Sequence, residues 1–165
     1  MKTIYLAGGC FWGTQKFFDQ FAGVISTSVG YANGGTDNPC YRDVCLGSGH
    51  AETVRIDFDE QKLSLADLLE YYFMAIDPTS VNRQGGDAGI QYRTGIYFTD
   101  GDLLPEIEAF MAEKRKEYAL PLAVEVGKLE NYCDAEEYHQ KYLEKNPGGY
   151  CHIPERLFSV GKDPE

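Results

Sequence analysis

Polar and apolar residues alternate strictly along Ala51-Glu52-Thr53-Val54-Arg55-Ile56-Asp57-Phe58-Asp59. Successive side chains of a β-strand point to opposite faces, so Val54, Ile56 and Phe58 share one face and the residues between them share the other. Residues 51–59 are therefore predicted to form a strand with one face on the core. By the same period of two, Glu52 lies on the apolar face at the start of this strand.

Strand-like and helix-like runs on both sides of this strand predict an α+β fold. Further strands are predicted at residues 3–7, 24–31, 95–98 and 122–126, and a first helix at about residues 10–21. Three later helices are predicted, with caps at Ser64, at Asp102, and at Asp134 together with Glu137; the first ends at Asp77-Pro78 and the last near Leu143.

The order of these elements selects one architecture. Two strands, 24–31 and 51–59, follow one another without a helix between them, so strands and helices do not alternate strictly. We therefore expect a ferredoxin-like α/β plait, in which helices pack on one mixed sheet. Residues 146–165 contain glycine and proline without periodicity and are predicted to be a long C-terminal coil.

Length, charge and hydropathy limit the class of protein. With 165 residues, the chain is predicted to form a single domain, residues 1–165, with a sizeable core. A net charge of −11 gives no general attraction to nucleic acid or anionic membranes. No apolar run approaches the roughly 18 residues of a membrane span, and the N-terminal apolar stretch is too short for a signal peptide. We expect a cytoplasmic protein that binds neither nucleic acid nor membrane.

The five cysteines stand at positions 10, 40, 45, 133 and 151, without a C-x-x-C pair. This pattern does not resemble a secreted disulfide framework, so buried thiols, a metal site or redox catalysis remain. Cys10 is the first candidate for catalysis. It follows Gly8-Gly9 at the predicted start of a helix, where unpaired N–H groups and the helix dipole favour the thiolate. The alternative is a buried structural cysteine between core aromatics.

Glu52 is a second, independent candidate. A carboxylate on the apolar face of a strand is costly to ionise, so its pKa is predicted to be raised. An acid that stays protonated near neutral pH can donate a proton to a substrate. The alternative is that Glu52 lies at the edge of the strand, beyond the core, and is solvated.

Other residues suggest weaker alternatives. Cys40, Cys45 and His50 are spaced unlike any common zinc module. The glycine-rich run at residues 85–89 lacks the lysine of a phosphate-binding loop and is predicted to be an ordinary loop. His139 or His152 would be needed as the base of a Cys–His hydrolase, but nothing directs either toward Cys10, so both are predicted to be structural or solvated.

Taken together, six blocks of this sequence resemble the A-type peptide methionine sulfoxide reductases. The blocks are Gly9-Cys10-Phe11-Trp12-Gly13, Asn38-Pro39-x-Tyr41, Gly49-His50-Ala51-Glu52, Asp87-x-Gly89-x-Gln91-Tyr92-Arg93, Tyr138-His139-Gln140 and Asn146-Pro147-x-Gly149-Tyr150-Cys151. They occur in the order of the family and span nearly the whole chain.

The resemblance implies a role for each matching residue. Cys10 resembles the nucleophile, and Tyr41, Glu52 and Tyr92 resemble the donors to the sulfoxide oxygen. Phe11, Trp12 and Tyr92 resemble the pocket for the methyl group of the substrate, Asp87 a supporting residue, and Cys151 the recycling cysteine. The chain departs from the family at Cys40, where Thr or Ser is expected, at Cys133, where an aromatic is usual, and at residues 45–49, which look one residue short. A second downstream recycling cysteine is absent.

These roles combine into an expected reaction. Cys10 attacks the sulfur of the S epimer of methionine sulfoxide, free or in proteins, while Glu52 supplies a proton to the oxygen. Cys10 becomes a sulfenic acid, a second thiol condenses with it to a disulfide, and thioredoxin reduces that disulfide. No metal, flavin or nucleotide is required. Two competing hypotheses are a Cys–His hydrolase, which has no use for a reductant, and a zinc-binding module that uses Cys40, Cys45 and His50.

Overall fold

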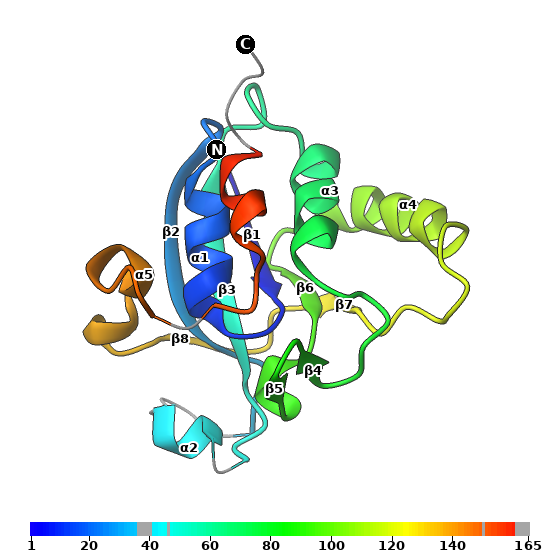
Figure 1. The fold of residues 1–165 in the computed structure, drawn as a ribbon. Helices are drawn as coiled ribbons and strands as arrows, with labels where there is room; N and C mark the ends of the chain where they lie inside the picture. The colour runs from blue at the N-terminus through cyan, green and yellow to red at the C-terminus, as the bar shows by residue number, and fades with distance from the viewer. Residues whose placement is uncertain (36–40, 46, 150, 161–165) are drawn as a thin grey trace.

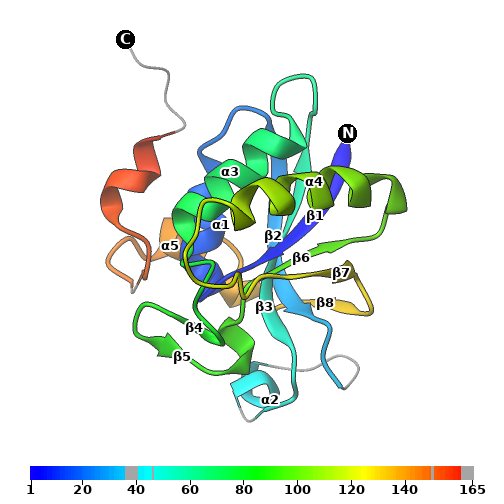
Figure 2. The same cartoon turned by 90° about the vertical axis from the view of Figure 1, so that its right-hand side faces the viewer.

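A mixed β-sheet with the strand order β7-β6-β1-β3-β2-β8 forms the centre of the protein (Figure 1; Figure 2). The computed structural model describes residues 1–35, 41–45, 47–149 and 151–160. The strands of this sheet are β1 (Lys2–Ala7), β2 (Val24–Ala32), β3 (Ala51–Phe58), β6 (Gly95–Phe98), β7 (Glu125–Lys128) and β8 (Tyr132–Asp134). Neighbouring strands are antiparallel except β6 and β7, which are parallel. The expected α+β class with a mixed sheet is confirmed.

Strand β3 is central because β1 pairs with one of its edges and β2 with the other. Its apolar side chains Val54, Ile56 and Phe58 are fully buried in the main core. On the other face Arg55 is exposed. The predicted alternation is therefore confirmed, although Thr53 is also fully buried on the polar face of the strand.

Three helices form this core together with one face of the sheet. They are α1 (Phe11–Asp19), α3 (Leu65–Ala75) and α4 (Leu104–Arg115). Figure 1 shows α1 lying across the central strands, with α3 and α4 beside it. The core joins Ile4 and Leu6 of β1, Phe17 and Phe18 of α1, and Leu68, Leu69 and Tyr72 of α3. Ser64 caps α3 as predicted, because its hydroxyl accepts the N–H of Asp67 at 3.1 Å.

The predicted caps of the two later helices are wrong. Asp100, and not Asp102, accepts an N–H group at 2.9 Å, and it caps the short 3-10 helix η2 (Gly101–Leu103) that leads into α4. The last predicted helix is split into η3 (Glu137–His139) and α5 (Tyr142–Lys145), and neither has a side-chain cap. The split falls at Lys141, whose φ of 55° is left-handed and cannot continue a helix.

Two other boundaries also differ from prediction. The strand expected at residues 122–126 starts only at Glu125, because the N–H of Ala123 donates to the carbonyl of Pro78 instead of a strand. The C-terminal coil contains a 3-10 helix, η4 (Glu155–Ser159). Remaining short elements are α2 (Tyr41–Cys45), β4 (Arg83–Gln84), β5 (Asp87–Ala88) and η1 (Ile90–Tyr92). The glycine-rich run at residues 85–89 contains the turn between β4 and β5, strand β5 itself and the residue that follows it.

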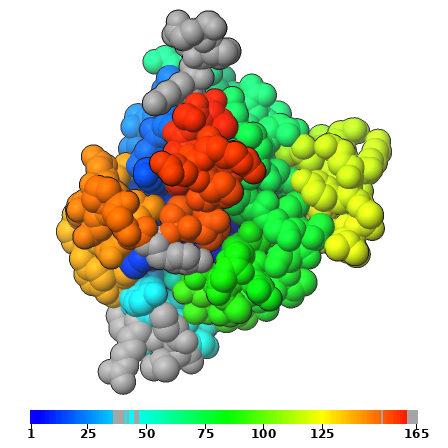
Figure 3. Space-filling view, viewed as in Figure 1, coloured from blue at the N-terminus to red at the C-terminus, as the bar shows by residue number. Residues whose placement is uncertain are grey.

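The end of the described chain packs along α1. Figure 1 shows this orange-to-red segment beside α1, and Figure 3 shows that it covers part of the helix surface. The Gln20 side chain donates to the carbonyl of Leu157 at 2.9 Å, and the ammonium of Lys16 lies 4.5 Å from the ring centre of Phe158. Within the described residues, no helix is both long and apolar enough to cross a membrane.

Candidate active site

Cys10 lies in the turn between β1 and α1 and is the N-cap residue of the helix. The preceding Gly9 has a φ of 76°, a left-handed conformation that glycine adopts without strain. A Cβ atom at Gly9 would also lie 2.7 Å from His152 and 2.9 Å from Gln84. The Gly9 N–H donates to the carbonyl oxygen of Tyr92 at 3.2 Å. The turn that carries Cys10 is thus tied to the turn that carries Tyr92.

The surroundings of Cys10 favour the thiol over the thiolate. Only 9% of the residue is exposed. Burial raises the pKa of Cys10 well above its ordinary value, and the nearby charge of Glu52 raises it further, while a hydrogen bond from the N–H of Trp12 lowers it. The first two effects dominate. The predicted effect of the helix start is therefore present in the N–H of Trp12, but burial and the charge of Glu52 outweigh it.

Strand β3 places Glu52 under the start of α1. The residue is 1% exposed, and its Oε1 accepts the N–H of Phe11 at 3.3 Å. Its Oε2 has no hydrogen-bond partner among the described residues. Burial raises the pKa of Glu52 to about 8, against the lowering effect of the Phe11 N–H, and the charge of Asp87 adds to the increase. The predicted raised pKa is confirmed and the solvated alternative is wrong.

Two tyrosines complete the polar side of this site. Burial raises the pKa of Tyr92 to about 12, and the charges of Glu52, Asp87 and Cys10 add to this effect. A hydrogen bond with the side chain of Tyr41 opposes it. Because these groups act on one another electrostatically, the structure brings together all the polar side chains that the sequence assigned to the substrate oxygen, with Asp87 nearby.

Aromatic side chains form the apolar side of the site. Trp12 is held from two directions: its Nε1 donates to Nδ1 of His139 at 2.9 Å, and its ring stacks on Tyr142 with 3.7 Å between the centres. The His139 ring also contacts Phe11 and Tyr41, with centres 5.3 and 4.7 Å apart. His139 is therefore a buried structural residue, one of the two alternatives predicted for it. Its Nδ1 accepts the hydrogen bond from the indole N–H of Trp12.

Cys151 lies close to the first turn of α1. Its Sγ is 2.6 Å from the position that a Cβ atom on Gly13 would occupy. Gly13 follows Cys10 by three residues, so both lie on the same face of the helix start. Burial raises the pKa of Cys151, and Cys151 is also among the groups that raise the pKa of Cys10. Both thiols are free, and the absence of a side chain at Gly13 lets the C-terminal segment approach this closely.

Two residues that support the site were missed in the sequence. Glu136 accepts the hydroxyl of Tyr31 at 2.7 Å and the N–H of Tyr41 at 2.9 Å, so it fixes the start of α2. Gln140 exchanges two hydrogen bonds, both 2.9 Å, with the backbone of Val29. Only Gln140 lay in a motif, Tyr138-His139-Gln140, and no local pattern marked Glu136. Both residues form hydrogen bonds to strands or helices that are distant in the sequence.

The remaining cysteines do not form a site that the structure describes. Cys133 lies on β8, opposite Tyr31 of β2, and is held by this strand pairing. Among the described residues, no group of three His, Cys, Asp or Glu side chains is placed to hold a metal ion. Cys40 and the side chain of Cys45 lie outside the described residues, as do Asn38, Pro39 and Tyr150 of the motifs. His50 is buried, with Nδ1 2.9 Å from the hydroxyl of Ser48.

A buried thiol next to a protonated acid and two tyrosine hydroxyls is suited to nucleophilic thiol chemistry on a substrate that carries an oxygen. Fold and site together therefore define a thiol-dependent enzyme. Comparison with known proteins identifies its family. The sequence model described as peptide methionine sulfoxide reductase matches residues 2–160.

A peptide methionine sulfoxide reductase MsrA from Lachnoclostridium phytofermentans is 56% identical over 163 residues, which cover 98% of each chain. Among solved structures, reduced Mxr1 from Saccharomyces cerevisiae is 35% identical, with a TM-score of 0.87 over 93% of this chain and 91% of the yeast chain. Mxr1 in complex with Trx2 is 25% identical, with a TM-score of 0.61 over 86% of this chain and 84% of the other. The chain belongs to the peptide methionine sulfoxide reductase MsrA family and is an enzyme of this kind.

Proposed function

We propose that this enzyme reduces the S epimer of methionine sulfoxide, free or in oxidised proteins, with Cys10 as nucleophile and Glu52 as proton donor. The observation that carries the proposal is the environment of Glu52. One carboxyl oxygen is fixed by the Phe11 N–H at the helix start, the other has no partner among the described residues, and burial raises the pKa to about 8. A proton is therefore available beside Cys10 at neutral pH.

The first step transfers an oxygen atom and two electrons. The sulfur of Cys10 attacks the sulfoxide sulfur while Glu52 gives its proton to the sulfoxide oxygen, which makes that oxygen a better leaving group. The thiol proton of Cys10 replaces the one lost from Glu52. The S–O bond then breaks and the hydroxyl group passes to the sulfur of Cys10 as the transient S–S bond breaks, so that Cys10 becomes a sulfenic acid and methionine leaves as the reduced thioether. No net proton is consumed, in agreement with a resting site that holds protons on both residues.

The surrounding side chains would orient the substrate. Tyr41 and Tyr92 are hydrogen-bonded to one another near Glu52, which supports a role as donors to the sulfoxide oxygen. Phe11 and the firmly held Trp12 offer an apolar wall for the methyl group. Asp87 raises the pKa values of Cys10, Glu52 and Tyr92, which supports its assignment as a supporting residue that favours the protonated site.

Cys151 is proposed as the thiol that resolves the sulfenic acid. Condensation of the two groups forms a disulfide and releases water, and an external dithiol then reduces the disulfide by exchange. The close packing of Cys151 on Gly13 supports this choice. Thioredoxin is the proposed reductant, supported by the yeast relative that was crystallised with Trx2.

Two features of the fold belong to the same proposal. The elements β1, α1, β2, β3, α3 and β6 follow the order β-α-β-β-α-β, and their four strands are neighbours in the order β6-β1-β3-β2. This order supports the ferredoxin-like plait, to which β7 and β8 add one strand at each edge. Residues 1–165 are proposed to form one catalytic domain.

Methionine release from each epimer of methionine sulfoxide, with dithiothreitol as reductant, tests the proposed reaction. We expect the native protein to reduce the S epimer only, and Cys10→Ser to be inactive with any reductant. Cys133→Ser is the matched control, since this thiol lies on β8, and it should keep the native rate. Turnover by Cys10→Ser would contradict the proposal.

A further inference from the structure

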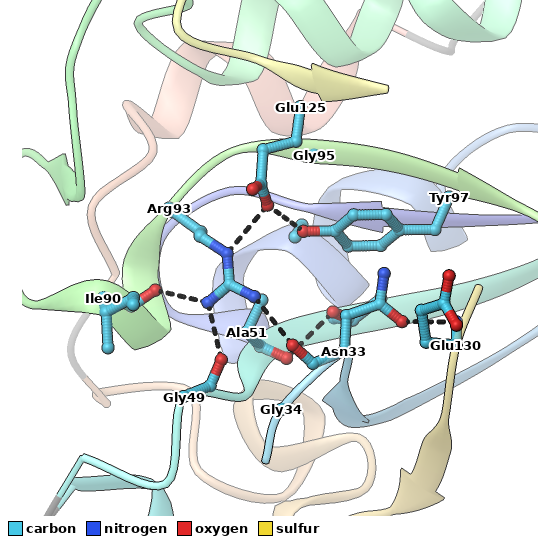
Figure 4. Close-up of polar contacts among 12 residues, drawn as sticks. Asn33, Gly34, Gly49, Ala51, Ile90, Arg93, Gly95, Tyr97, Glu125 and Glu130 are labelled. Atoms are coloured by element: carbon cyan, nitrogen blue, oxygen red, sulfur yellow. Dashed lines mark hydrogen bonds and ion pairs between the residues drawn. The ribbon is translucent and has the colours of Figure 1, made fainter. Parts of the chain in front are cut away.

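Arg93 forms a hydrogen-bonded clamp between several segments of the chain (Figure 4). Its Nη1 donates to the carbonyl oxygens of Gly49 at 3.0 Å and Ile90 at 2.9 Å, and its Nη2 donates to the carbonyl oxygen of Asn33 at 3.1 Å. Its Nε donates to a carboxylate oxygen of Glu125 at 2.8 Å. The side chain is 11% exposed. One planar guanidinium therefore joins three backbone segments and one strand of the sheet.

The first two segments belong to the connection between β2 and β3. Asn33 directly follows β2, and Gly49 lies two residues before β3 begins. Arg93 therefore holds both ends of the segment that carries Tyr41. The N–H of Gly35 also donates to the carbonyl of Ser48 at 2.9 Å, so the two ends are in direct contact. Glu52 follows Gly49 by three residues.

The third segment is the turn that carries Tyr92. Ile90 is the first residue of η1 and Tyr92 the last, and Arg93 follows immediately. The carbonyl of Tyr92 accepts the N–H of Gly9, the residue before Cys10. The guanidinium thus meets three segments of the chain, and these lead to Tyr41, Glu52 and Tyr92.

Strands β6 and β7 of the sheet anchor the clamp. Glu125 is the first residue of β7, and the same carboxylate oxygen that receives Arg93 also accepts the hydroxyl of Tyr97 at 2.7 Å. Tyr97 is a buried residue of β6. The backbone N–H of Glu125 donates to the carbonyl of Thr94, next to Arg93. The positive charge is therefore paired, and the position of the guanidinium is set by β6 and β7.

We propose that Arg93 is a positioning residue for the reductase reaction, which sets the distances between the oxygen-binding groups and Cys10 without contacting substrate. This inference rests on the roles proposed above for Glu52, Tyr41 and Tyr92. Lysine cannot replace the clamp. An ammonium group carries the same charge but cannot present the planar fork that reaches three carbonyl groups and a carboxylate together.

The test compares Arg93→Lys and Arg93→Ala with Arg115→Lys and Arg115→Ala, since Arg115 is exposed at the end of α4. A displacement of about 1 Å can cost about 100-fold in rate, so we expect single-turnover methionine release to fall by about 10- to 100-fold in both Arg93 variants, while KM measured in the steady state changes little. Millimolar guanidinium should restore part of the rate of Arg93→Ala, because it can occupy the vacated site.

A pH profile separates positioning from a loss of folding. Looser packing would admit water to Glu52, so the fall in rate at high pH should begin at lower pH in Arg93→Lys than in the native protein. A native rate and profile in Arg93→Lys, or no rescue of Arg93→Ala by guanidinium, would overturn the positioning role. Glu52→Gln in the same assay tests the proposed function: if it keeps the native rate, the reaction scheme itself fails, whatever the Arg93 variants do.

Discussion

Cys10 and Glu52 determine how protons are shared at the site. Each is buried, and an ionised Glu52 makes ionisation of Cys10 harder. Two neighbouring negative charges in a poorly solvated site are unfavourable, so the resting site favours a thiol and a carboxylic acid. The neutral pair suits a reaction that protonates an oxygen atom, and it also protects the thiol from unspecific oxidation, which requires the thiolate.

The pH dependence of the chemical step follows from Glu52. The acid is active when protonated, so the single-turnover rate should fall as pH rises through about 8, the raised pKa of the group. Glu52→Gln keeps an acceptor for the Phe11 N–H but cannot give up a proton. General acid catalysis contributes typically about 10²- to 10⁴-fold, and we expect a loss in this range together with loss of the high-pH limb.

Quenched-flow measurement of methionine release across the pH range checks this expectation. Glu108→Gln, a change at an exposed position of α4, should match the native profile. A Glu52→Gln enzyme with a native rate would remove Glu52 from the chemistry.

Individual site residues were predictable from sequence where their chemistry is local. Glu52 stands out because its strand alternates so regularly, and Cys10 because two glycines precede it. The pKa of Cys10 was not predictable, because burial and the charge of Glu52, which lies on β3, outweigh the helix start. Likewise Glu136 fixes Tyr41 although the two residues are 95 positions apart in the sequence.

At the scale of elements, the C-terminal segment and α1 act as a pair. Three consecutive residues, Cys151, His152 and Ile153, approach Gly13 so closely that a methyl group there would collide with the first of them. This packing keeps the proposed resolving thiol near the nucleophile before any oxidation occurs. A disulfide requires Cα atoms within about 7 Å, so this segment must bring Cys151 within that range of Cys10 for the bond to form.

Removal of the resolving thiol should separate the two half-reactions. Without reductant, Cys151→Ser should still release about one methionine per protein, since the first step consumes only Cys10, but it should not turn over with thioredoxin. Peptide mapping of the oxidised native protein should show Cys10 joined to Cys151. Cys133→Ser serves as control and should turn over normally. A Cys10–Cys133 bridge, or full thioredoxin-dependent turnover by Cys151→Ser, would contradict this assignment while leaving the reductase reaction intact.

Regular elements were easier to predict than short ones. The strand at residues 95–98 and the helix capped by Ser64 agree with the structure, because each carries a strong periodic pattern and a clear boundary signal. Strand β8 has only three residues and pairs only at the edge of β2, so its sequence holds too few positions for a pattern. The capping error at Asp102 arose because Asp100 and Asp102 both stand at one helix start, whereas the error at Asp134 arose because the left-handed Lys141 splits the predicted helix.

At the scale of the whole molecule, the sheet order explains why distant segments meet. Strands β1 and β3 are neighbours, so the end of β1, which leads to Cys10, lies beside the start of β3, which carries Glu52. The α+β class was predictable from the order of elements, whereas the placement of β7 and β8 at opposite edges was not. Those strands depend on pairing alone, and their sequences show no alternation that identifies a partner.

The free energy of unfolding should depend on pH because the buried Glu52 has a raised pKa. Its pKa is about 8 in the folded protein and 4.5 ordinarily, so the native state binds more protons than the unfolded chain between these values. The stabilising contribution of the protonated group is therefore complete below about pH 4.5 and is lost as pH rises through about 8. At about 1.4 kcal/mol per pH unit, the loss amounts to several kcal/mol, about 3 to 5.

Urea unfolding under reducing conditions at several pH values measures this loss. His152 titrates in the opposite sense, since burial lowers its pKa to about 4, so the informative quantity is the difference between variant and native protein. Glu52→Gln has no proton to lose, and its stability relative to the native protein should increase steadily from about pH 5 to pH 8. Glu108→Gln should show no such trend. If the Glu52→Gln and native curves run parallel, the acid is not held protonated by the fold, and the proton for the sulfoxide must come from another group.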